Sequence, residues 1–363
     1  MPAGLRYTQD KTEASIKDAR VWVGFPYAGT GVAPGLPTLP ASVPFDPTSP
    51  PVPPRIEKCV YGDPDPAVNG CRDELEQTSE AVTGLFDVDY FLTQDIMLYA
   101  KYARGYRMGS INMFGGDPFR TFDPERVDAY EIGAKTTFGG VVPGTFNAAL
   151  FYNDLSDQQL QVGYVPRNGT TPTTGISNAG SSVIQGFELE TSLMLLDDLM
   201  LAISYTYLDT ELKETEALPN IPNVVLIPSS VAHEHLTYSP RHSVVASLNY
   251  RLPLPVEIGD VSLGATYAYT DKQLASAPPY NDPFAGLSGS PYAWMPSYEV
   301  VNFNANWNGI FGSNFDVGVF ITNAFDEKYE TYVAGLYNST GFETRNVGVP
   351  KMWGAKVRYT FGR

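Results

Sequence analysis

The chain closes with Trp353-Gly354-Ala355-Lys356-Val357-Arg358-Tyr359-Thr360-Phe361, a stretch that alternates between apolar and polar side chains. Successive side chains of a strand point to opposite faces, so Trp353, Val357 and Phe361 share one face while Lys356 and Arg358 share the other. Aromatic residues stand at both ends of the apolar face. About ten alternating residues flanked by aromatic residues are typical of a strand that crosses a membrane as part of a β-barrel.

The same alternation recurs along the chain. In its clearest form, Val301, Phe303, Ala305 and Trp307 alternate with four asparagines. The pattern predicts strands at residues 3–9, 13–23, 81–91, 96–105, 126–138, 145–154, 184–195, 199–209, 242–252, 261–271, 301–308, 315–322 and 353–361. Charged residues stay off the apolar faces except near strand ends. That gradient suits a lipid-facing surface, where a cation costs roughly 2–4 kcal/mol at the bilayer midplane and about 0–1 kcal/mol near the interface.

The predicted connections alternate between short turns, such as Asp197-Asp198, and long loops, such as residues 210–241. The longest, residues 24–79, holds 12 of the 30 prolines, and proline cannot join a central ladder. The fold expected is therefore all-β: an antiparallel transmembrane barrel portion of about 13 meander strands with short periplasmic turns and long extracellular loops. An odd count would make the first and last strands run the same way, whereas bacterial barrels have even counts. The odd count therefore predicts an incomplete barrel. On its own, the chain is expected to form an open or incompletely closed curved sheet, to aggregate, or to need the missing part of the barrel.

Composition excludes several classes of protein. The 363 residues carry a formal net charge of -16, from 40 acidic and 24 basic side chains, which argues against nucleic acid as a partner. No apolar run approaches the roughly 18 residues of a membrane-spanning helix. Met1 to Tyr7 does not read as a signal peptide, so either the protein is not exported or its true N-terminus lies upstream. Cys59 and Cys71 are expected to form a disulfide in an oxidising compartment, the alternative being a reduced pair.

Six blocks of the sequence form an ordered series. They are Tyr99 to Gly109 (YAKYARGYRMG), Pro124-Glu125 with Tyr130 to Lys135, Asn147 to Asp154, Asn178-Ala179-Gly180 with Gly186 to Glu190, Thr322 to Tyr329 (TNAFDEKY), and Gly348 to Lys351 followed by the strand ending at Phe361. In this order they resemble characteristic stretches of TonB-dependent outer-membrane receptors. Lys351 stands where the family usually has arginine, and Gly362 and Arg363 extend past the terminal phenylalanine.

The resemblance implies active transport across the outer membrane of a Gram-negative bacterium. The ligand would be a ferric siderophore or related iron complex, with a vitamin or glycan as alternatives. A plug domain would link the barrel to the TonB–ExbB–ExbD complex, and barrel-assembly machinery would read the C-terminal strand. Residues 1–363 would be the C-terminal portion of such a barrel, without plug or first strands, and unable to transport alone. We expect membrane lipid as a partner, no cofactor and no enzymatic activity.

Candidate ligand contacts come from two places. Arg104, Tyr106, Arg107 and Arg120 flank one predicted external loop, where arginines could hold an anionic chelate or instead form rim anchors and ion pairs. His233 and His235 share a strand face near His242, and could bind a metal or its chelate or simply be solvated. No metal is assigned.

Two other classes stay open. A passive porin-like or adhesin-like barrel would show the same alternation without a plug. A soluble all-β module or carbohydrate enzyme could use carboxylate pairs such as Glu188 and Glu190. Those pairs, however, alternate along single strands, as residues lining a barrel lumen do.

Overall fold

The computed structural model describes residues 2–17, 19–24, 52–59, 70–112, 119–166, 173–215, 224–227, 235–275, 294–334 and 344–361. Within these ranges no helix is long and apolar enough to span a membrane. One short 3-10 turn, η1 (Ile310–Gly312), is the helical element among the described residues.

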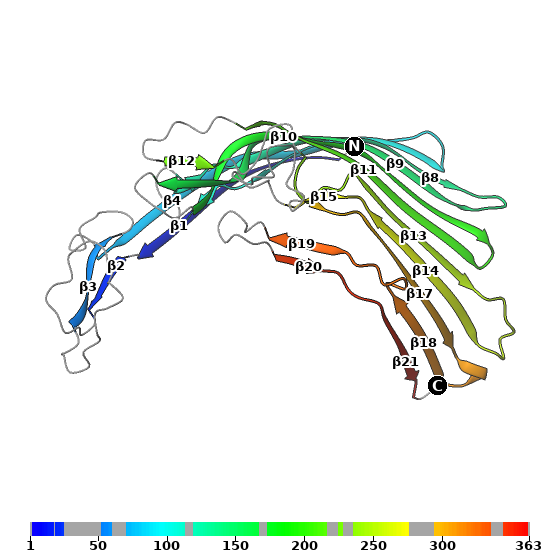
Figure 1. The fold of residues 1–363 in the computed structure, drawn as a ribbon. Helices are drawn as coiled ribbons and strands as arrows, with labels where there is room; N and C mark the ends of the chain where they lie inside the picture. The colour runs from blue at the N-terminus through cyan, green and yellow to red at the C-terminus, as the bar shows by residue number, and fades with distance from the viewer. Residues whose placement is uncertain are drawn as a thin grey trace.

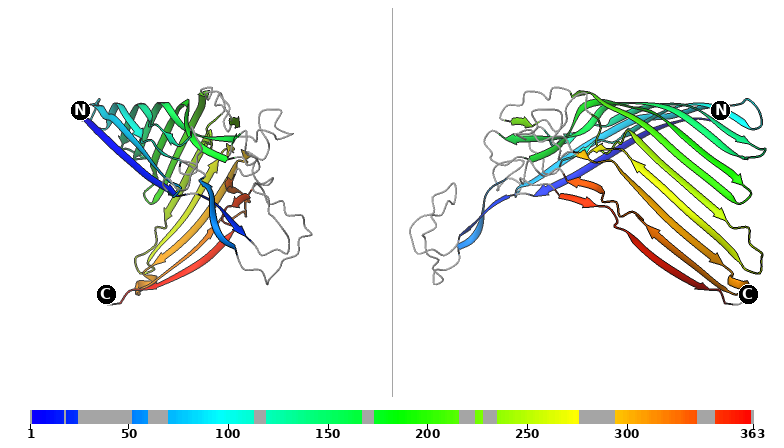
Figure 2. Two further views of the ribbon diagram at one scale, coloured as in Figure 1. Left: turned by 90° about the vertical axis from the view of Figure 1, so that its left-hand side faces the viewer. Right: turned by 45° about the vertical axis from the view of Figure 1, so that its right-hand side comes forward.

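A single antiparallel sheet organises the molecule, and it curves strongly (Figures 1 and 2). Its path runs through twelve strands: β1 (Ala3–Lys17), β4 (Arg72–Phe91), β5 (Ile96–Arg107), β8 (Glu125–Phe138), β9 (Gly144–Pro166), β10 (Thr173–Leu196), β11 (Leu199–Thr215), β13 (His242–Arg251), β14 (Asp260–Thr270), β17 (Tyr298–Asn308), β18 (Phe315–Thr322) and β21 (Met352–Tyr359). A thirteenth, β12 (Val224–Ile227), pairs with the outer part of β9. The predicted all-β antiparallel meander is confirmed.

Four two-stranded sheets lie at the ends of the long connections. They are β2 (Ala19–Gly24) with β3 (Val52–Cys59), β6 (Ser110–Ile111) with β7 (Thr121–Phe122), β15 (Gln273–Leu274) with β16 (Trp294–Met295), and β19 (Glu330–Ala334) with β20 (Thr344–Val347). Short turns close the hairpins at the opposite end of the main sheet (Figure 1). The expected alternation of short and long connections is therefore present.

The predicted number of about 13 strands is confirmed, but the predicted direction of the first strand is wrong. Residues 3–9 and the start of 13–23 form one strand, β1, which pairs without interruption with β4 from Ala3↔Phe86 to Lys17↔Arg72. β1 therefore runs opposite to β21, because twelve antiparallel strands lie along the path. The error arose because Gln9 to Glu13 is polar on both faces, so an alternation pattern hides the strand there. Likewise, the predicted loop at residues 24–79 contains β3 and the first residues of β4.

Cross-strand register builds two chemically distinct faces. Leu98, Ala134 and Ala148 lie in one row across β5, β8 and β9, and Ala100, Ile132 and Leu150 lie in the next row. Lys101 and Glu131, which are also paired across β5 and β8, lie on the other face. We call these the apolar face and the polar face. Every strand on the path keeps this parity where its register is unbroken, so the alternation in the sequence becomes a two-sided wall.

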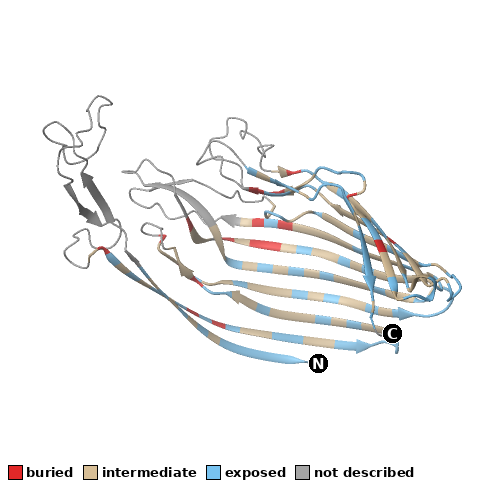
Figure 3. Cartoon of the chain, turned by 90° about the horizontal axis from the view of Figure 1, so that it is seen from below, coloured by how far each residue is buried: buried red, intermediate tan, exposed pale blue. Residues whose placement is uncertain are grey.

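Large apolar side chains of the main sheet are exposed, whereas in a protein with a water-excluding core they would be buried. Large apolar side chains on the apolar face are exposed, for example Ile132 at 56% and Leu150 at 55%. The few buried apolar residues lie instead at the long-loop end, among them Phe119, Met295 and Val333 (Figure 3). Such a wall needs a non-aqueous solvent on its apolar side, because soluble monomers rarely expose contiguous apolar patches of this extent.

The path ends at β1 on one side and at β21 on the other, and among the described residues these two strands form no ladder with each other. The sheet is therefore open, as expected from the sequence. Its two edges present unpaired backbone groups, which cost several kcal/mol each in a hydrocarbon environment.

Candidate functional site

The four predicted ligand contacts around the first external loop each have a carboxylate partner. Arg104 donates from Nε and Nη2 to Asp128 at 2.7 and 2.6 Å. The hydroxyl of Tyr106 donates to Asp10 of β1. Arg107 donates from Nη2 to Oε2 of Glu125 at 2.6 Å, and Arg120 pairs with Asp73.

The four residues are not brought together at one point. Arg104 and Tyr106 continue the apolar-face row of Tyr102, whereas Arg107 falls on the polar face because its position in β5 has the opposite parity. Arg120 lies beyond the main sheet, before β7, and is only 14% exposed. Of the four, Arg107 is the one that stands on the polar face with its side chain largely exposed, at 59%.

A network of amide side chains holds the loop between β5 and β8 in place. Asn178 accepts a hydrogen bond from the backbone N–H of Asp123 at 2.6 Å and donates to the carbonyls of Asp123 and Asp157. Gln159 donates to the carbonyls of Met108 and Asp123, both at 2.9 Å. Side chains of the long strands β9 and β10 thus hold the loop in position through hydrogen bonds to its backbone.

The other side of the same loop is fixed to β4. The backbone N–H of Gly109 donates to the hydroxyl of buried Ser79 at 2.9 Å, and Gln77 donates to Asp123 at 2.9 Å. Sequence reasoning missed these residues, because nothing in a single sequence marks which serines and amides bind a distant backbone. The only signal was that Asn178 lies in one of the blocks that carry the resemblance.

His235 is held by protein groups on both ring nitrogens. Its Nδ1 lies 2.9 Å from the carbonyl oxygen of Thr210, and its Nε2 lies 3.3 Å from Nη2 of Arg241. The carbonyl can only accept and the guanidinium can only donate, so both contacts are hydrogen bonds in the tautomer that carries its hydrogen on Nδ1. His233 lies outside the described residues. No group of three or more potential metal ligands occurs in the part of the chain that the structure describes.

Cys71 is buried and disulfide-bonded. The side chain of Cys59, its predicted partner, lies outside the described residues, although the backbone of Cys59 ends β3 opposite Ala19. Cys71 directly precedes Arg72, which pairs with Lys17, so the backbone positions opposite the two cysteine neighbourhoods, Lys17 and Ala19, are two residues apart in the sequence.

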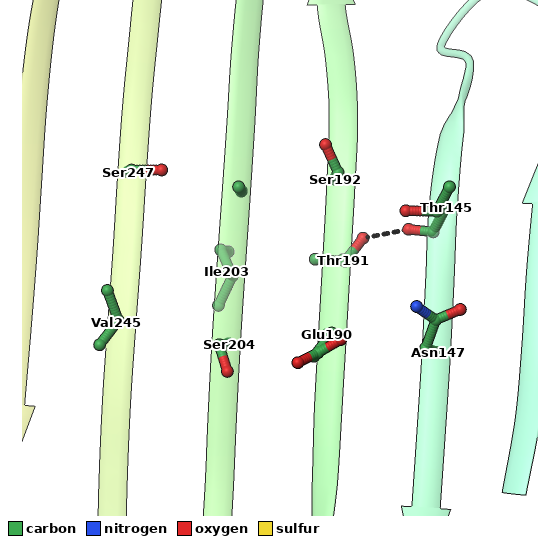
Figure 4. A pocket seen from close by; sticks show the side chains of 10 residues that line it. Thr145, Asn147, Glu190, Thr191, Ser192, Ile203, Ser204, Val245 and Ser247 are labelled. Carbon is green, nitrogen blue, oxygen red and sulfur yellow. Dashed lines mark hydrogen bonds between the residues drawn. The ribbon is translucent and has the colours of Figure 1, made fainter.

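A shallow hollow of about 280 Å³ lies on the polar face where β9, β10, β11 and β13 run side by side (Figure 4). Its lining is mostly small and hydroxylated, with Glu190 and Asn147 at one side: Thr145, Asn147, Glu190, Thr191, Ser192, Ala202, Ile203, Ser204, Val245 and Ser247. Small side chains leave room for another surface to approach the wall here, and they offer hydrogen-bond donors and acceptors to it. The arrangement suits binding rather than catalysis.

Residues 3–324 match a family model described as TonB-dependent receptor-like, β-barrel. The chain is 25% identical over 281 residues to a probable TonB-dependent siderophore receptor, PiuA, of Acinetobacter baumannii, which covers 75% of the chain and 33% of the relative. It is 25% identical over 262 residues to the pesticin receptor of Yersinia pestis, covering 72% and 33%. The chain thus spans about a third of the length of these curated relatives.

Solved structures show the same fold. The ferric yersiniabactin uptake receptor FyuA of Yersinia pestis superposes with a TM-score of 0.60 at 19% identity, over 80% of this chain and 39% of that one. The ferric-catecholate import receptor Fiu of E. coli, in its closed form, gives 0.59 at 18% identity, over 98% and 41%.

Proposed function

The chain belongs to the TonB-dependent receptor-like β-barrel family, and on that premise we propose that it forms part of the wall of an outer-membrane receptor that takes up a ferric siderophore or a related iron complex. Members of this family are transport receptors rather than enzymes, and they reside in the outer membrane of Gram-negative bacteria. The observation that carries the proposal is the family match over residues 3–324 together with an apolar face whose large side chains are exposed on most strands of the path, from β1 to β9 and from β13 to β21.

The two faces of the sheet have different roles in this proposal. The apolar face contacts lipid, and the polar face, with its hollow at Ser192 and Ser204, faces the plug. The energy for transport comes from the TonB–ExbB–ExbD complex acting on that plug. The C-terminal strand is read by the barrel-assembly machinery. This chain has no enzymatic activity and carries no cofactor in the proposal.

Among the predicted ligand contacts, Arg107 is the strongest candidate. It stands on the polar face at the loop end, and its guanidinium donates to Glu125 through Nη2, so it keeps further donors for an anionic chelate. Arg104, Tyr106, Arg120 and His235 already serve other protein groups, and they would contact ligand only if loops rearranged. His233 completes the proposed set.

The test is uptake of radiolabelled iron, supplied as a panel of ferric siderophores, by cells that produce the receptor containing this chain. TonB-dependent, protonophore-sensitive accumulation of one chelate supports the proposal. Accumulation of a vitamin or oligosaccharide instead would change the substrate class. Equal entry of many small solutes without TonB would favour a passive porin. Arg107→Gln should raise the concentration needed for half-maximal uptake, whereas Arg251→Gln, at the short-turn end, should not.

A further inference from the structure

A row of tyrosines crosses the apolar face near its long-loop end. Tyr102, Tyr130 and Tyr152 face one another across β5, β8 and β9, with ring centroids 5.1 and 6.4 Å apart. Tyrosines at such positions lie at the level of lipid headgroups, because their rings are apolar and their hydroxyls are polar.

The next row on the same face, two residues further toward the loops, is charged instead of apolar. Arg104, Asp128 and Asp154 occupy it in register across β5, β8 and β9. Two further cations stand close by: Arg126 pairs with Asp157 at 3.4 Å, and Lys213 reaches Asp154 at 3.9 Å. We call these residues the charged belt: Arg104, Arg126, Asp128, Asp154, Asp157 and Lys213.

The belt is attached directly to the tyrosine row. Tyr102 donates its hydroxyl hydrogen to Oδ1 of Asp128 at 2.6 Å. Lys213 donates from Nζ to the hydroxyl of Tyr152 at 3.4 Å, with its charge 6.0 Å from the centre of that ring. The positions of the cations are therefore fixed relative to the aromatic residues, and not merely scattered over a polar surface.

The pairs within the belt leave the cations open to a further anion. The side chains of Arg104, Arg126 and Lys213 are 41–50% exposed. Arg104 uses two of its five N–H groups on Asp128, and its side chain is 47% exposed, so it has further donors to offer to an anion. Ion pairs this exposed contribute little to folding stability, so stability does not account for three of them side by side.

Distance along the strand places the belt at phosphate level. Two residues of antiparallel strand rise about 7 Å, so the belt lies just beyond tyrosines that mark the edge of the hydrocarbon. We propose that the charged belt binds the phosphate groups of membrane lipid headgroups, with Arg104, Arg126 and Lys213 as donors. This inference rests on the membrane placement in the proposed function. It also gives Arg104 a role distinct from the ligand contact predicted from sequence, because its face is the one opposite to Arg107.

Lipid is the expected ligand of the charged belt because the belt continues a surface that lipid covers. The belt is the direct continuation of a face whose apolar rows are exposed from β5 to β9, and lipid is what covers those rows in the proposed placement. A soluble chelate approaching the polar face would not reach the belt. Arginine is suited to bind phosphate through two parallel hydrogen bonds, and the ammonium of a lysine adds a mobile point charge.

The experiment uses the receptor that contains this chain, in phosphatidylethanolamine vesicles that contain lipid A with both phosphates, or lipid A from which the phosphates have been removed. After extraction in mild detergent, native mass spectrometry counts the lipid A molecules retained per chain. The combined variant Arg104→Gln, Arg126→Gln and Lys213→Gln should retain about one-tenth as much bisphosphorylated lipid A as the native chain. A matched control, Lys101→Gln, Arg251→Gln and Arg358→Gln, removes three polar-face cations and should retain the native amount.

Equal retention by the native chain and the belt variant overturns the proposal, and so does equal retention of the two forms of lipid A. Heat-modifiable mobility on a detergent gel reports folding. If the combined variant does not fold, the single variants Arg126→Gln and Lys213→Gln carry the test, since each leaves the Arg104–Asp128 pair intact. Iron uptake is measured in parallel. A belt variant that keeps lipid A but loses uptake overturns only the proposal that the charged belt binds lipid phosphate. Native receptor that keeps lipid A without taking up iron overturns only the proposed substrate.

Discussion

The ring of Tyr99 lies directly over Gly133 on the neighbouring strand, so close that a Cβ atom added at Gly133 would come within 2.5 Å of a ring carbon. The ring stays there because its hydroxyl donates to Oε1 of Glu131 at 2.7 Å and the ammonium of Lys135 lies 5.5 Å from its centre. Phe320 covers Gly354 in the same way. Glycine thus lets an aromatic ring lie flat on the polar face, where a side chain would push it away.

Gly133→Ala should therefore destabilise the sheet by roughly 1–3 kcal/mol, the usual range for overpacking. The ring must shift, and shifting it breaks the hydrogen bond to Glu131. Urea unfolding in lipid vesicles measures the change. The control is Gly4→Ala in β1, where an added Cβ meets nothing within 4 Å. Similar losses in the two variants would show that the ring contact is not the cause.

The ion pair between Arg120 and Asp73 should anchor the external loop to β4. Both side chains are about 15% exposed. Removing one partner leaves a charge that is poorly solvated, which costs about 3–5 kcal/mol for a buried pair. Arg120→Met should increase hydrogen exchange at Phe119 to Asp123. The double variant Arg120→Met, Asp73→Leu should recover part of the protection, whereas strictly additive effects would show that the two groups do not interact.

Tyr238 should make the loops above β13, β14 and β18 sensitive to alkali. Its hydroxyl donates to the carbonyl of Val333 at 3.0 Å, and its backbone N–H donates to Leu274 at 2.7 Å. Partial desolvation of its hydroxyl raises the pKa of Tyr238 above its ordinary value, although the residue as a whole is 40% exposed. The folded loops therefore hold this proton more tightly than the unfolded chain does. Their stabilisation is complete below about pH 10, where free tyrosine ionises, and is lost as the pH rises through the folded-state pKa.

A phenolate difference titration of native protein against Tyr238→Phe isolates this group. The difference spectrum should titrate above the range of free tyrosine, and the variant should lose about 1 kcal/mol of loop stability at neutral pH with its hydrogen bond. If the difference signal titrates at the ordinary tyrosine value, the hydroxyl of Tyr238 is not desolvated in the folded loops.

An added positive charge should destabilise the sheet to different extents at two adjacent residues of β11. Ile203→Arg puts a cation on the apolar face near mid-strand and should cost roughly 2–4 kcal/mol in lipid. Ser204→Arg places the cation on the polar face, in the hollow beside Glu190, and should cost much less. Unfolding midpoints in vesicles give the comparison. Equal costs would mean that the apolar face is not in contact with lipid.

The sequence by itself determined the two faces of the wall and therefore the class of fold. In stretches such as residues 301–308 and 353–361, a period of two is enough to assign each side chain to a face, because strand geometry fixes that parity locally. The six ordered blocks identified the family for the same reason: they are local and contiguous. Where both faces are polar, as at Gln9 to Glu13, local pattern no longer distinguishes a strand from a loop, and the predicted strand direction was wrong.

Only the tertiary structure decided what the charged residues do. Arg104 and Arg107 are three positions apart, yet register places one beside Asp128 on the apolar face and the other beside Glu125 on the polar face. Asn178 of β10 and Asp123 of the connection before β8 are joined although they lie 55 residues apart in the sequence. The pairing of strands sets these partners, and pairing depends on contacts between residues far apart in the chain, which no local pattern encodes. The sequence could therefore name the face of each residue, whereas its partner was decided by the register of the whole sheet.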